Sequence, residues 1–492
     1  MGGEVLSRRR AFPALVGALM ISCASSALAA DATAEQARAI TQTLETYFGK
    51  TPPGEAPAFT VTPNGQDYSF TVDFSRMLAP LIKPGFSFTM SPVNGTLAQL
   101  SDGKWRVGYS GDYEFDYSAP GVDSNVQIIG TQSSQVFDPA VAAFVSGTSD
   151  IARLSSQSSN SRPGSEMLSS RETSKIHSDM TAVAKGSDAV TTSGRQTSAG
   201  TIVHFSGARI PPVDASIDSS SVDTTLDGVR NRSLLSLWAW FVAHPSAEAV
   251  KSAQDELRPL LRAALPIFDR LDISGDAKKV SATFPAGRFA ISDAALDFDL
   301  NGPGAPGSLT EKVSVNGIDL SVETMPSWAR SLVPRDVAME MNVSGYALAT
   351  AMETIIANFD LRATPGLKPE LVASLRDELL PSGTLLIRAT SVRLASDLYE
   401  VTMDGQIKAG PGAKPTGSMV VRAKGLDAVQ DVLAEAGKTD RAAQSSMIAL
   451  ATAQGLAKVG ADGVSTWEII LGEDGQVTVN GHSLKRPAAQ PQ

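Results

Sequence analysis

The side chains that most often carry out catalysis or bind metals are few and scattered in this chain. Its four histidines lie far apart in the sequence, at His177, His204, His244 and His482. Motifs such as HExxH or HxH, which place two metal ligands on one element, are therefore absent. The serines also lack the G-x-S-x-G pattern that exposes a hydrolase nucleophile between a strand and a helix. We predict no enzymatic activity, no cofactor and no bound metal.

The acidic residues leave one catalytic alternative open. Two carboxylates in one cleft can hydrolyse glycosides, and predicted strands and turns offer Asp297, Asp299, Glu468 and Asp474. Their spacing fixes no two of them at a useful separation. Aromatic residues, which commonly line glycan sites, make up only 6% of the chain. A carboxylate-based hydrolase of the cell envelope is therefore kept only as a rival hypothesis.

An apolar cluster is the most unusual candidate for binding. Residues 234–242 read LLSLWAWFV, the most apolar stretch beyond the N-terminal segment. One interpretation is a helix buried in the core. The other is a surface that lines a pocket or groove for an apolar ligand, or docks on a membrane, formed by Leu234, Leu237, Trp238 and Phe241.

The N-terminal segment has the three regions of a secretory signal peptide. Arginines at positions 8–10 form a basic start, residues 11–21 are apolar, and Ala27-Leu28-Ala29 supplies the small residues that signal peptidase requires. We predict cleavage before Ala30 or Asp31, and a mature protein that works in the periplasm.

Three variants of this signal remain open. An uncleaved membrane anchor would need about 20 apolar residues, and the stretch is weakened by Pro13 and by the serines in residues 22–26. Arg9-Arg10-Ala11-Phe12 also fits a twin-arginine signal, so the export machinery is either the Sec or the twin-arginine system. Lipidation of Cys23 would need a leucine three residues earlier, where Met20 stands.

Cysteine usage and charge exclude several classes of function. The only cysteine, Cys23, falls inside the signal, so the mature chain has no disulfide and no thiol chemistry. The formal net charge is −10, and removal of residues 1–29, whose three arginines and Glu4 sum to +2, takes it to −12. An acidic chain without a basic patch is repelled by nucleic acid. We predict that the protein binds no nucleic acid.

Turn chemistry is the strongest structural signal. Asn-Gly and Asp-Gly pairs suit the positive φ angles of two-residue hairpins, and several of them stand between runs of alternating apolar and polar residues. This pattern predicts hairpin turns at Asp102-Gly103, Asn316-Gly317, Asp404-Gly405 and Asp474-Gly475. Strands of this kind form antiparallel sheets with one apolar and one polar face.

A region rich in Ser and Thr, at about residues 145–200, allows two interpretations. Its low apolar content is compatible with a disordered linker. Thr is also compatible with strands, and clear strands flank the region at 126–129 and 202–205. We favour the interpretation that this region continues the sheet.

Helical periodicity interrupts the strands. We expect helices at 34–48, 234–242, 347–358, 369–380, 426–436 and 440–458, and a long amphipathic helix that begins after a cap at His244-Pro245-Ser246 and ends near Asp269, with Pro266 bending or ending it. An apolar sheet face has to be covered, and these helices are the available cover. We therefore predict an α+β protein whose long, twisted antiparallel sheets are built from hairpins and meanders and partly covered by amphipathic helices.

The same patterns divide the chain into regions. We expect a signal peptide at 1–29, an N-terminal helix and β-meander region at 30–228, an apolar and amphipathic helical segment at 229–275, a C-terminal α+β region at 276–485 and a disordered tail at 486–492.

The chain resembles a bacterial exported family catalogued as domain of unknown function 2125. The resemblance rests on the export signal, on Phe137-Asp138-Pro139-Ala140 at the end of a meander, on the stretch 417–421 before the helix at Leu426, and on the terminal strand-turn-strand at 474–481. These motifs are structural and transfer no catalytic residue. The chain is also loosely similar to envelope proteins of the AsmA type, whose long amphipathic sheets form grooves implicated in lipid or envelope homeostasis. That likeness implies lipid as a ligand.

Together these observations favour a protein that binds rather than catalyses. We predict that an apolar sheet face, incompletely covered by helices, binds a lipid or another hydrophobic ligand in envelope homeostasis. The alternative is an interaction or scaffold protein whose sheet edges recruit an envelope partner by strand addition.

Overall fold

The structure is a computed structural model that describes residues 31–51, 54–79, 82, 84–161, 164, 166–302, 306–363 and 369–484. The predicted signal peptide and the predicted tail at 486–492 lie outside the described residues. Within them, strands β1–β22 outnumber helices α2–α11, and every pairing between strands is antiparallel. The expected antiparallel α+β class is therefore confirmed in its broad form.

The chain groups into two compact units. Unit 1 takes Met1–Leu271 and Glu353–Lys368, and unit 2 takes Asp272–Met352 and Pro369–Gln492.

The sheet of unit 1 is a meander of long strands. Its strands are β1 Phe59–Asn64, β2 Asp67–Val72, β3 Ser87–Met90, β4 Val93–Gln99, β5 Trp105–Ala119, β6 Val122–Asp138, β7 Ala143–Asn160, β8 Met167–Lys185, β9 Ala189–Gly207 and β10 Ile210–Val229. From β4 to β10 each strand pairs with its neighbours in the sequence, and β3 pairs with β5 beside β4. The Ser/Thr-rich region thus forms strands, as favoured, because β-branched Thr fits the pleated surface.

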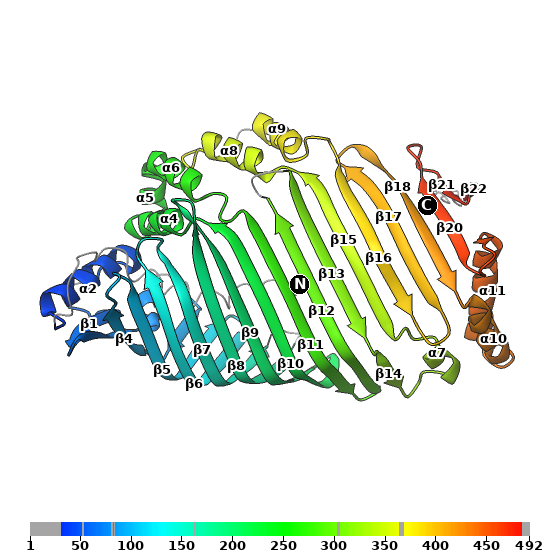
Figure 1. Ribbon diagram of the computed structural model, residues 1–492, viewed down its shortest axis with the longest axis horizontal. Helices are drawn as coiled ribbons and strands as arrows, with labels where there is room; N and C mark the ends of the chain where they lie inside the picture. The colour runs from blue at the N-terminus through cyan, green and yellow to red at the C-terminus, as the bar shows by residue number, and fades with distance from the viewer. Residues whose placement is uncertain are drawn as a thin grey trace. The chain divides into compact units, whose positions relative to one another are not determined.

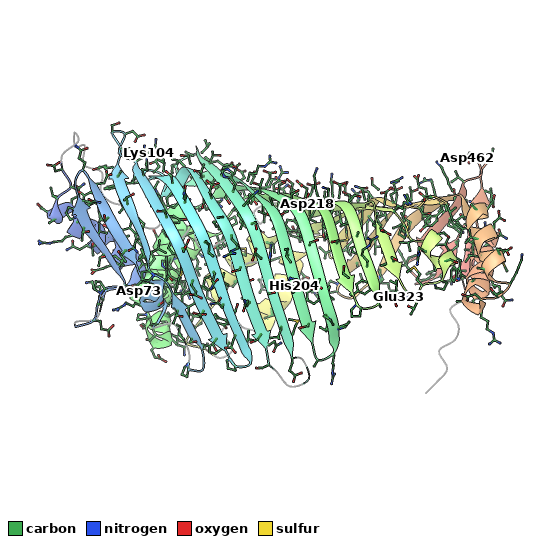
Figure 2. The ribbon with its side chains drawn as sticks, turned by 90° about the horizontal axis from the view of Figure 1, so that it is seen from below. Asp73, Lys104, His204, Asp218, Glu323 and Asp462 are labelled. Carbon is green, nitrogen blue, oxygen red and sulfur yellow. The ribbon has the colours of Figure 1, made fainter. Side chains whose placement is uncertain are left out.

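The strands of unit 1 bend near their middle. Gly130, Lys175 and Gly200 have φ angles of 68°, 48° and 78°, which are unusual inside a strand. They lie at one level of the sheet, since Ile129 pairs with Arg153, and Arg153 with Ser174. The pairing register is the same on both sides of this level, so the strands bend here without a β-bulge. The meander is seen broadside in two views turned by 90°, as expected for a strongly curved sheet (Figures 1 and 2).

The main core of unit 1 lies where helix α2 (Ala34–Phe48) covers the first strands. Thr33 caps this helix by accepting a hydrogen bond from the Gln36 backbone N–H. Its apolar stripe of Ala37, Ile40 and Leu44 packs in a cluster that includes fully buried Trp105, Phe137, Leu97 and Val107. The predicted helix at 34–48 is therefore confirmed with its predicted bounds.

The remaining helices of unit 1 are α3 Phe74–Leu78, α4 Asn231–Ala243, α5 Ala247–Ser252 and α6 Gln254–Ala264. Ser246 caps α5, as predicted. The prediction of a single long helix that ends near Asp269 is wrong. Ala253 leaves helical geometry (φ −97°, ψ 16°) and separates α5 from α6, and α6 ends because Leu265, which precedes Pro266, is extended.

Unit 2 contains strands that are shorter than the longest strands of unit 1, together with the last helices of the chain. After β11 Arg270–Phe284, which begins at the boundary of the units, its strands are β12 Gly287–Asn301, β13 Gly307–Asn316, β14 Asp319–Val322, β15 Asp336–Tyr346, β16 Leu385–Ala395, β17 Glu400–Gly410, β18 Ala413–Lys424, β19 Lys458–Val459, β20 Ser465–Leu471, β21 Val477–Val479 and β22 His482–Leu484. Its helices are α7 Ser327–Ser331, α9 Pro369–Leu379, α10 Leu426–Ala436 and α11 Arg441–Gly455, and α8 Leu348–Asn358 belongs to unit 2 only as far as Met352. The pairing order is β12–β13–β15–β16–β17–β18–β20.

Two of the four predicted hairpin turns are confirmed. Asp102-Gly103 joins the paired strands β4 and β5, and Asp474-Gly475 joins β20 and β21. The other two predictions are wrong. Asp404-Gly405 lies inside β17, where a Cβ on Gly405 would meet the Ser418 backbone oxygen at 2.9 Å, so the glycine serves close strand approach.

Asn316-Gly317 also fails to make a hairpin. The strands before and after it, β13 and β14, both pair antiparallel with β12, so the chain keeps its direction through Gly317. A Cβ at Gly317 would meet the Ser292 hydroxyl oxygen at 2.3 Å, which explains glycine at this position without a reversal of the chain.

An ion-pair network at one end of the unit 1 meander predicts a pH effect. Lys185 Nζ lies 2.5 Å from Asp227 Oδ2 and 3.1 Å from Asp269 Oδ2, and the Thr191 hydroxyl donates to Asp227 Oδ1 at 2.5 Å. Hydrogen bonds from Lys185 and Thr191 lower the pKa of Asp227. Its stabilising contribution is therefore present above the ordinary carboxyl pKa of about 4 and is lost as the pH falls below it.

We expect Asp227→Asn to lower the free energy of unfolding at pH 6, and the gap from the wild type to close as the pH falls from about 4 to about 2. Urea unfolding at a series of pH values measures this. Asp188→Asn, an exposed turn residue between β8 and β9, is the matched control and should show no such gap. A gap that stays constant down to pH 2 would contradict the role of the Asp227 charge.

Candidate functional site

The register of unit 2 brings its apolar side chains onto one face of the sheet. Residues directly opposite each other in an antiparallel pair share a face, as do alternate residues along one strand. Leu296 pairs with Val313, and Val313 with Met339. Ile387 pairs with Ile407. The set assembled in this way is called the apolar face: Ala294, Leu296, Phe298, Leu300, Leu309, Glu311, Val313, Val315, Val337, Met339, Met341, Val343, Leu385, Ile387, Ala389, Val392, Leu394, Val401, Met403, Gly405, Ile407, Ala409, Gly417, Met419, Val421, Ala423, Trp467, Ile469 and Leu471.

The opposite face of these strands is polar and makes its own contacts. Asp297 pairs with Lys312, whose Nζ lies 3.3 Å from Glu340 Oε2 on the next strand. Arg388 Nε donates to Gln406 Oε1 at 3.4 Å. Charged and amide side chains on this face therefore form ion pairs and hydrogen bonds with one another. Unit 2 therefore has an antiparallel sheet with one wet face and one face that needs cover.

The apolar face is only partly covered in the described chain. Four of its large side chains are well exposed: Ile407 at 46%, Leu296 at 42%, Met339 at 37% and Met419 at 36%. The helices α10 and α11 pack mainly on each other and with Trp328 and Leu332, around Val429, Leu433 and Ala443. Figure 1 draws these two helices beside β20, and no helix crosses the middle of β12–β17.

The chemistry of this face suits hydrocarbon. Val, Ile, Leu and Met present a smooth surface, and the unbranched Met side chains adapt to different shapes. Glu311 is the one ionisable side chain in this set; Arg288 and Asp319, which the alternation places on the same side at the other end of β12, pair with each other at 2.7 Å. Such a surface offers dispersion contacts and removal of apolar area from water, with almost no hydrogen-bonding groups.

The residues singled out from the sequence lie elsewhere, on α4 of unit 1. Leu234 and Leu237 are half-buried, whereas Trp238 is 43% and Phe241 is 40% exposed. The Trp238 indole N–H donates to the Tyr47 backbone oxygen at 2.8 Å, which fixes α4 against the end of α2. Their role in lining a ligand site stays a prediction.

The helix α4 also has a buried side that packs against α6. Trp240 is buried, its ring stacks on His244 with centroids 4.2 Å apart, and its indole N–H donates to Glu256 Oε2 at 3.2 Å. These contacts hold the helical segment together.

Three of the carboxylates of the rival hydrolase hypothesis lie on the polar face of the unit 2 sheet, two of them on β12 and one on β20, and the fourth lies in a turn. Asp297 and Asp299 alternate along β12 on its polar face, opposite Lys312 and Thr310. Glu468 lies on the polar face of β20, opposite Val420, and Asp474 lies in the turn after that strand.

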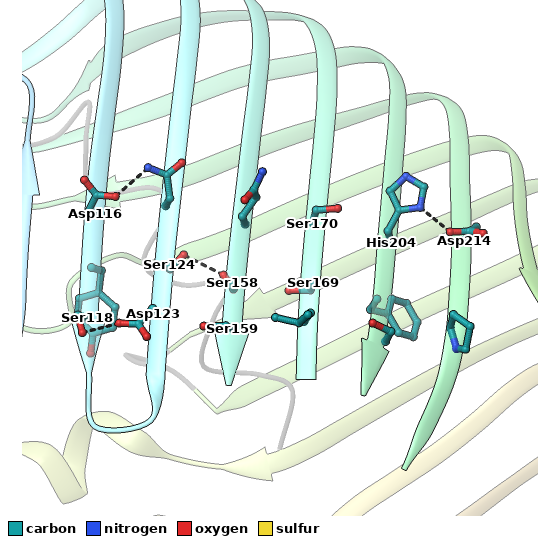
Figure 3. A pocket seen from close by; sticks show the side chains of 17 residues that line it. Asp116, Ser118, Asp123, Ser124, Ser158, Ser159, Ser169, Ser170, His204 and Asp214 are labelled. Atoms are coloured by element: carbon teal, nitrogen blue, oxygen red, sulfur yellow. Dashed lines mark hydrogen bonds and ion pairs between the residues drawn. The ribbon is translucent and has the colours of Figure 1, made fainter. Parts of the chain in front are cut away.

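A polar hollow of about 670 Å³ lies on the unit 1 meander (Figure 3). Its floor is tied by cross-strand contacts. The Ser118 hydroxyl donates to Asp123 Oδ1 at 2.6 Å, and Ser124 and Ser158 share a hydrogen bond of 2.9 Å. Serine and aspartate are the most frequent residues of the lining, which also includes Leu168, Phe205 and Pro212.

One row in this hollow has the residue types of a hydrolase triad. Ser170 pairs with His204, and His204 with Asp214, whose Oδ1 lies 2.5 Å from the His204 Nδ1. A triad needs a hydrogen bond from the serine to the histidine and donors for an oxyanion. In Figure 3 the dashed line joins His204 to Asp214, and none joins Ser170 to His204. The row therefore has one of the two hydrogen bonds of a triad.

A second His–Asp pair repeats this cross-strand contact. His177 Nδ1 lies 2.7 Å from Asp150 Oδ1, and the residue opposite His177 on the other side is Thr197. Both pairs are exposed to solvent. We interpret them as surface hydrogen bonds between neighbouring strands that help to fix the register.

The described residues contain no group of three or more His, Cys, Asp or Glu side chains placed to hold a metal ion. No helix in the described part of the chain is both long and apolar enough to cross a membrane. No protein-family model, curated protein or solved structure matches the chain. The resemblance drawn from the sequence motifs therefore stays a prediction.

Proposed function

We propose that the protein binds the hydrocarbon chain of a lipid, or of another hydrophobic ligand, on the apolar face of unit 2. The observation that carries this proposal is the set of residues across seven paired strands that is apolar except for Glu311, with Ile407, Leu296, Met339 and Met419 exposed. We further propose that it does so as an exported protein in the periplasm, where lipids that move between membranes must cross water.

Energetics support hydrocarbon as the occupant. Each methylene group removed from water contributes roughly 0.8 kcal/mol. An acyl chain that buries about ten methylenes on the face therefore gains about 8 kcal/mol before losses of ordering entropy, which is enough to offset several immobilised bonds. Contiguous exposed apolar patches on protein surfaces often mark interaction sites.

The protein purified from its native cell envelope is expected to carry lipid. Extraction with organic solvent, followed by mass spectrometry, should recover lipid in an amount comparable to the protein. The double variant Ile407→Lys with Met419→Lys, purified in the same way, should release much less lipid.

Equal recovery from the wild type and this double variant would mean that any lipid is bound elsewhere. A co-purifying protein that covers the face, without lipid, would replace the proposal with the scaffold alternative.

A further inference from the structure

The Glu311 carboxylate has no ion-pair or hydrogen-bond partner among the residues that the structure describes. It lies on β13 with its side chain on the apolar face, directly opposite Phe298 on β12 and Met341 on β15. Its neighbours on the same face of β13 are Leu309 and Val313. The nearest lysine in the sequence, Lys312, is on the other face of the strand with Glu340. A carboxylate is therefore surrounded by apolar side chains.

This position creates a problem for a purely hydrocarbon ligand. Glu311 is half-buried, so water still reaches it when the face is open. Hydrocarbon laid over it would strip away that water, and an ionised carboxylate without a partner is strongly unfavourable in an apolar environment. A ligand that covers β12, β13 and β15 binds best when it brings a partner for this carboxylate, because otherwise the group is desolvated as an ion or has to take up a proton.

The aromatic ring of Phe298, opposite Glu311, indicates which kind of cationic group would bind there. Cations are attracted to the face of an aromatic ring, and quaternary ammonium groups are commonly recognised by aromatic rings. A positively charged nitrogen above β13 would contact a carboxylate on one side and the Phe298 ring on the neighbouring strand. The acidic chain, with a formal net charge of −10, also favours a cationic ligand at long range.

We propose that the ligand of the apolar face is an amphiphile with a hydrocarbon chain and a cationic ammonium group, and that Glu311 and Phe298 hold this ammonium group. This inference rests on the proposed function and specifies the ligand class. The hydrocarbon chain lies on the apolar strands that flank β13, and the ammonium group selects the ligand at Glu311.

The test compares amphiphiles that share a dodecyl chain and differ in head group. Dodecyltrimethylammonium, the neutral dodecyl maltoside and the anionic dodecyl sulfate are titrated as monomers against the full chain, at physiological salt. The wild type should bind the cationic amphiphile about tenfold more tightly than the neutral one. Glu311→Gln, which keeps the shape of the side chain, should abolish this preference and leave the affinity for dodecyl maltoside unchanged or higher.

Two further variants separate the roles of position and ring. Glu468→Gln removes one negative charge from the polar face of the same sheet and should keep the full cationic preference. Phe298→Leu should weaken binding of dodecyltrimethylammonium several-fold while leaving dodecyl maltoside within about twofold.

The outcomes are distinct. A cationic preference that survives in Glu311→Gln, or that falls equally in Glu468→Gln, would overturn the inference and assign the preference to net charge. Failure of the wild type to bind any of the three amphiphiles would instead remove the proposed function itself.

Discussion

Lysine at both Ile407 and Met419 should abolish hydrocarbon binding, lowering the affinity for dodecyl maltoside by at least about 100-fold, or roughly 2.7 kcal/mol. The two residues lie on the neighbouring strands β17 and β18, where Ile407 pairs with Gly417 and Met419 with Gly405. Both are partly exposed, so the lysine ammonium groups reach water in the free protein and the fold tolerates them. Hydrocarbon bound over them would have to desolvate two charges.

The matched control places the same two charges on the other face of the same strands. Gln406 and Ser418 are adjacent in sequence to the two test positions, pair with each other, and are exposed on the polar face. Gln406→Lys with Ser418→Lys should leave the affinity within about twofold. Titration calorimetry with the monomeric amphiphile compares the two double variants. An equal loss in both would show that added positive charge, and not the apolar face, governs binding.

Replacement of Trp105 by alanine should produce the largest loss of stability, about 3–5 kcal/mol of the free energy of unfolding of unit 1. Trp105 is fully buried at the start of β5, where it pairs with Phe137 and lies 6.2 Å from the Tyr68 ring between centroids. Its removal leaves a cavity in the cluster beneath α2 that the surrounding strands cannot close.

Phenylalanine at the same position separates packing from hydrogen bonding. The Trp105 indole N–H is buried and makes no hydrogen bond among the described residues. Trp105→Phe removes that unsatisfied donor while keeping an aromatic ring, so it should cost clearly less than Trp105→Ala. Urea unfolding measures both, and Leu168→Ala, at an exposed strand end, should change stability by no more than about 0.5 kcal/mol. Equal losses in the phenylalanine and alanine variants would contradict this account.

Sequence patterns predicted helices and strands well where contacts between residues near in sequence determine the structure. The helices at 34–48 and 426–436 have the expected bounds, since apolar periodicity sets the face that is buried. The turn predicted at Asp404-Gly405 failed for a reason that is visible in its neighbours. Val401, Met403 and Ile407 keep period-two alternation through the dipeptide, as expected for one uninterrupted strand.

The candidate site could be predicted as a type of surface but not as a set of residues. Alternation indicated that strands such as β13 have an apolar side, but only the register shows that Phe298, Glu311 and Met341 form one row. That row depends on the pairing of β13 with β15, past β14, which no local pattern encodes. The apolar run at 234–242 drew attention because its residues are adjacent in sequence, whereas those of the apolar face are dispersed along nearly 180 residues.

The meander of β6–β9 has a consequence for how unit 1 is assembled. Each of these strands pairs only with the strands that precede and follow it in the chain, across short connections. Contacts are therefore local for so large a sheet, and the entropy of closing each loop is small. Cooperativity then passes between nearest neighbours, as in repeat proteins, and folding can nucleate at one hairpin and extend strand by strand along the chain.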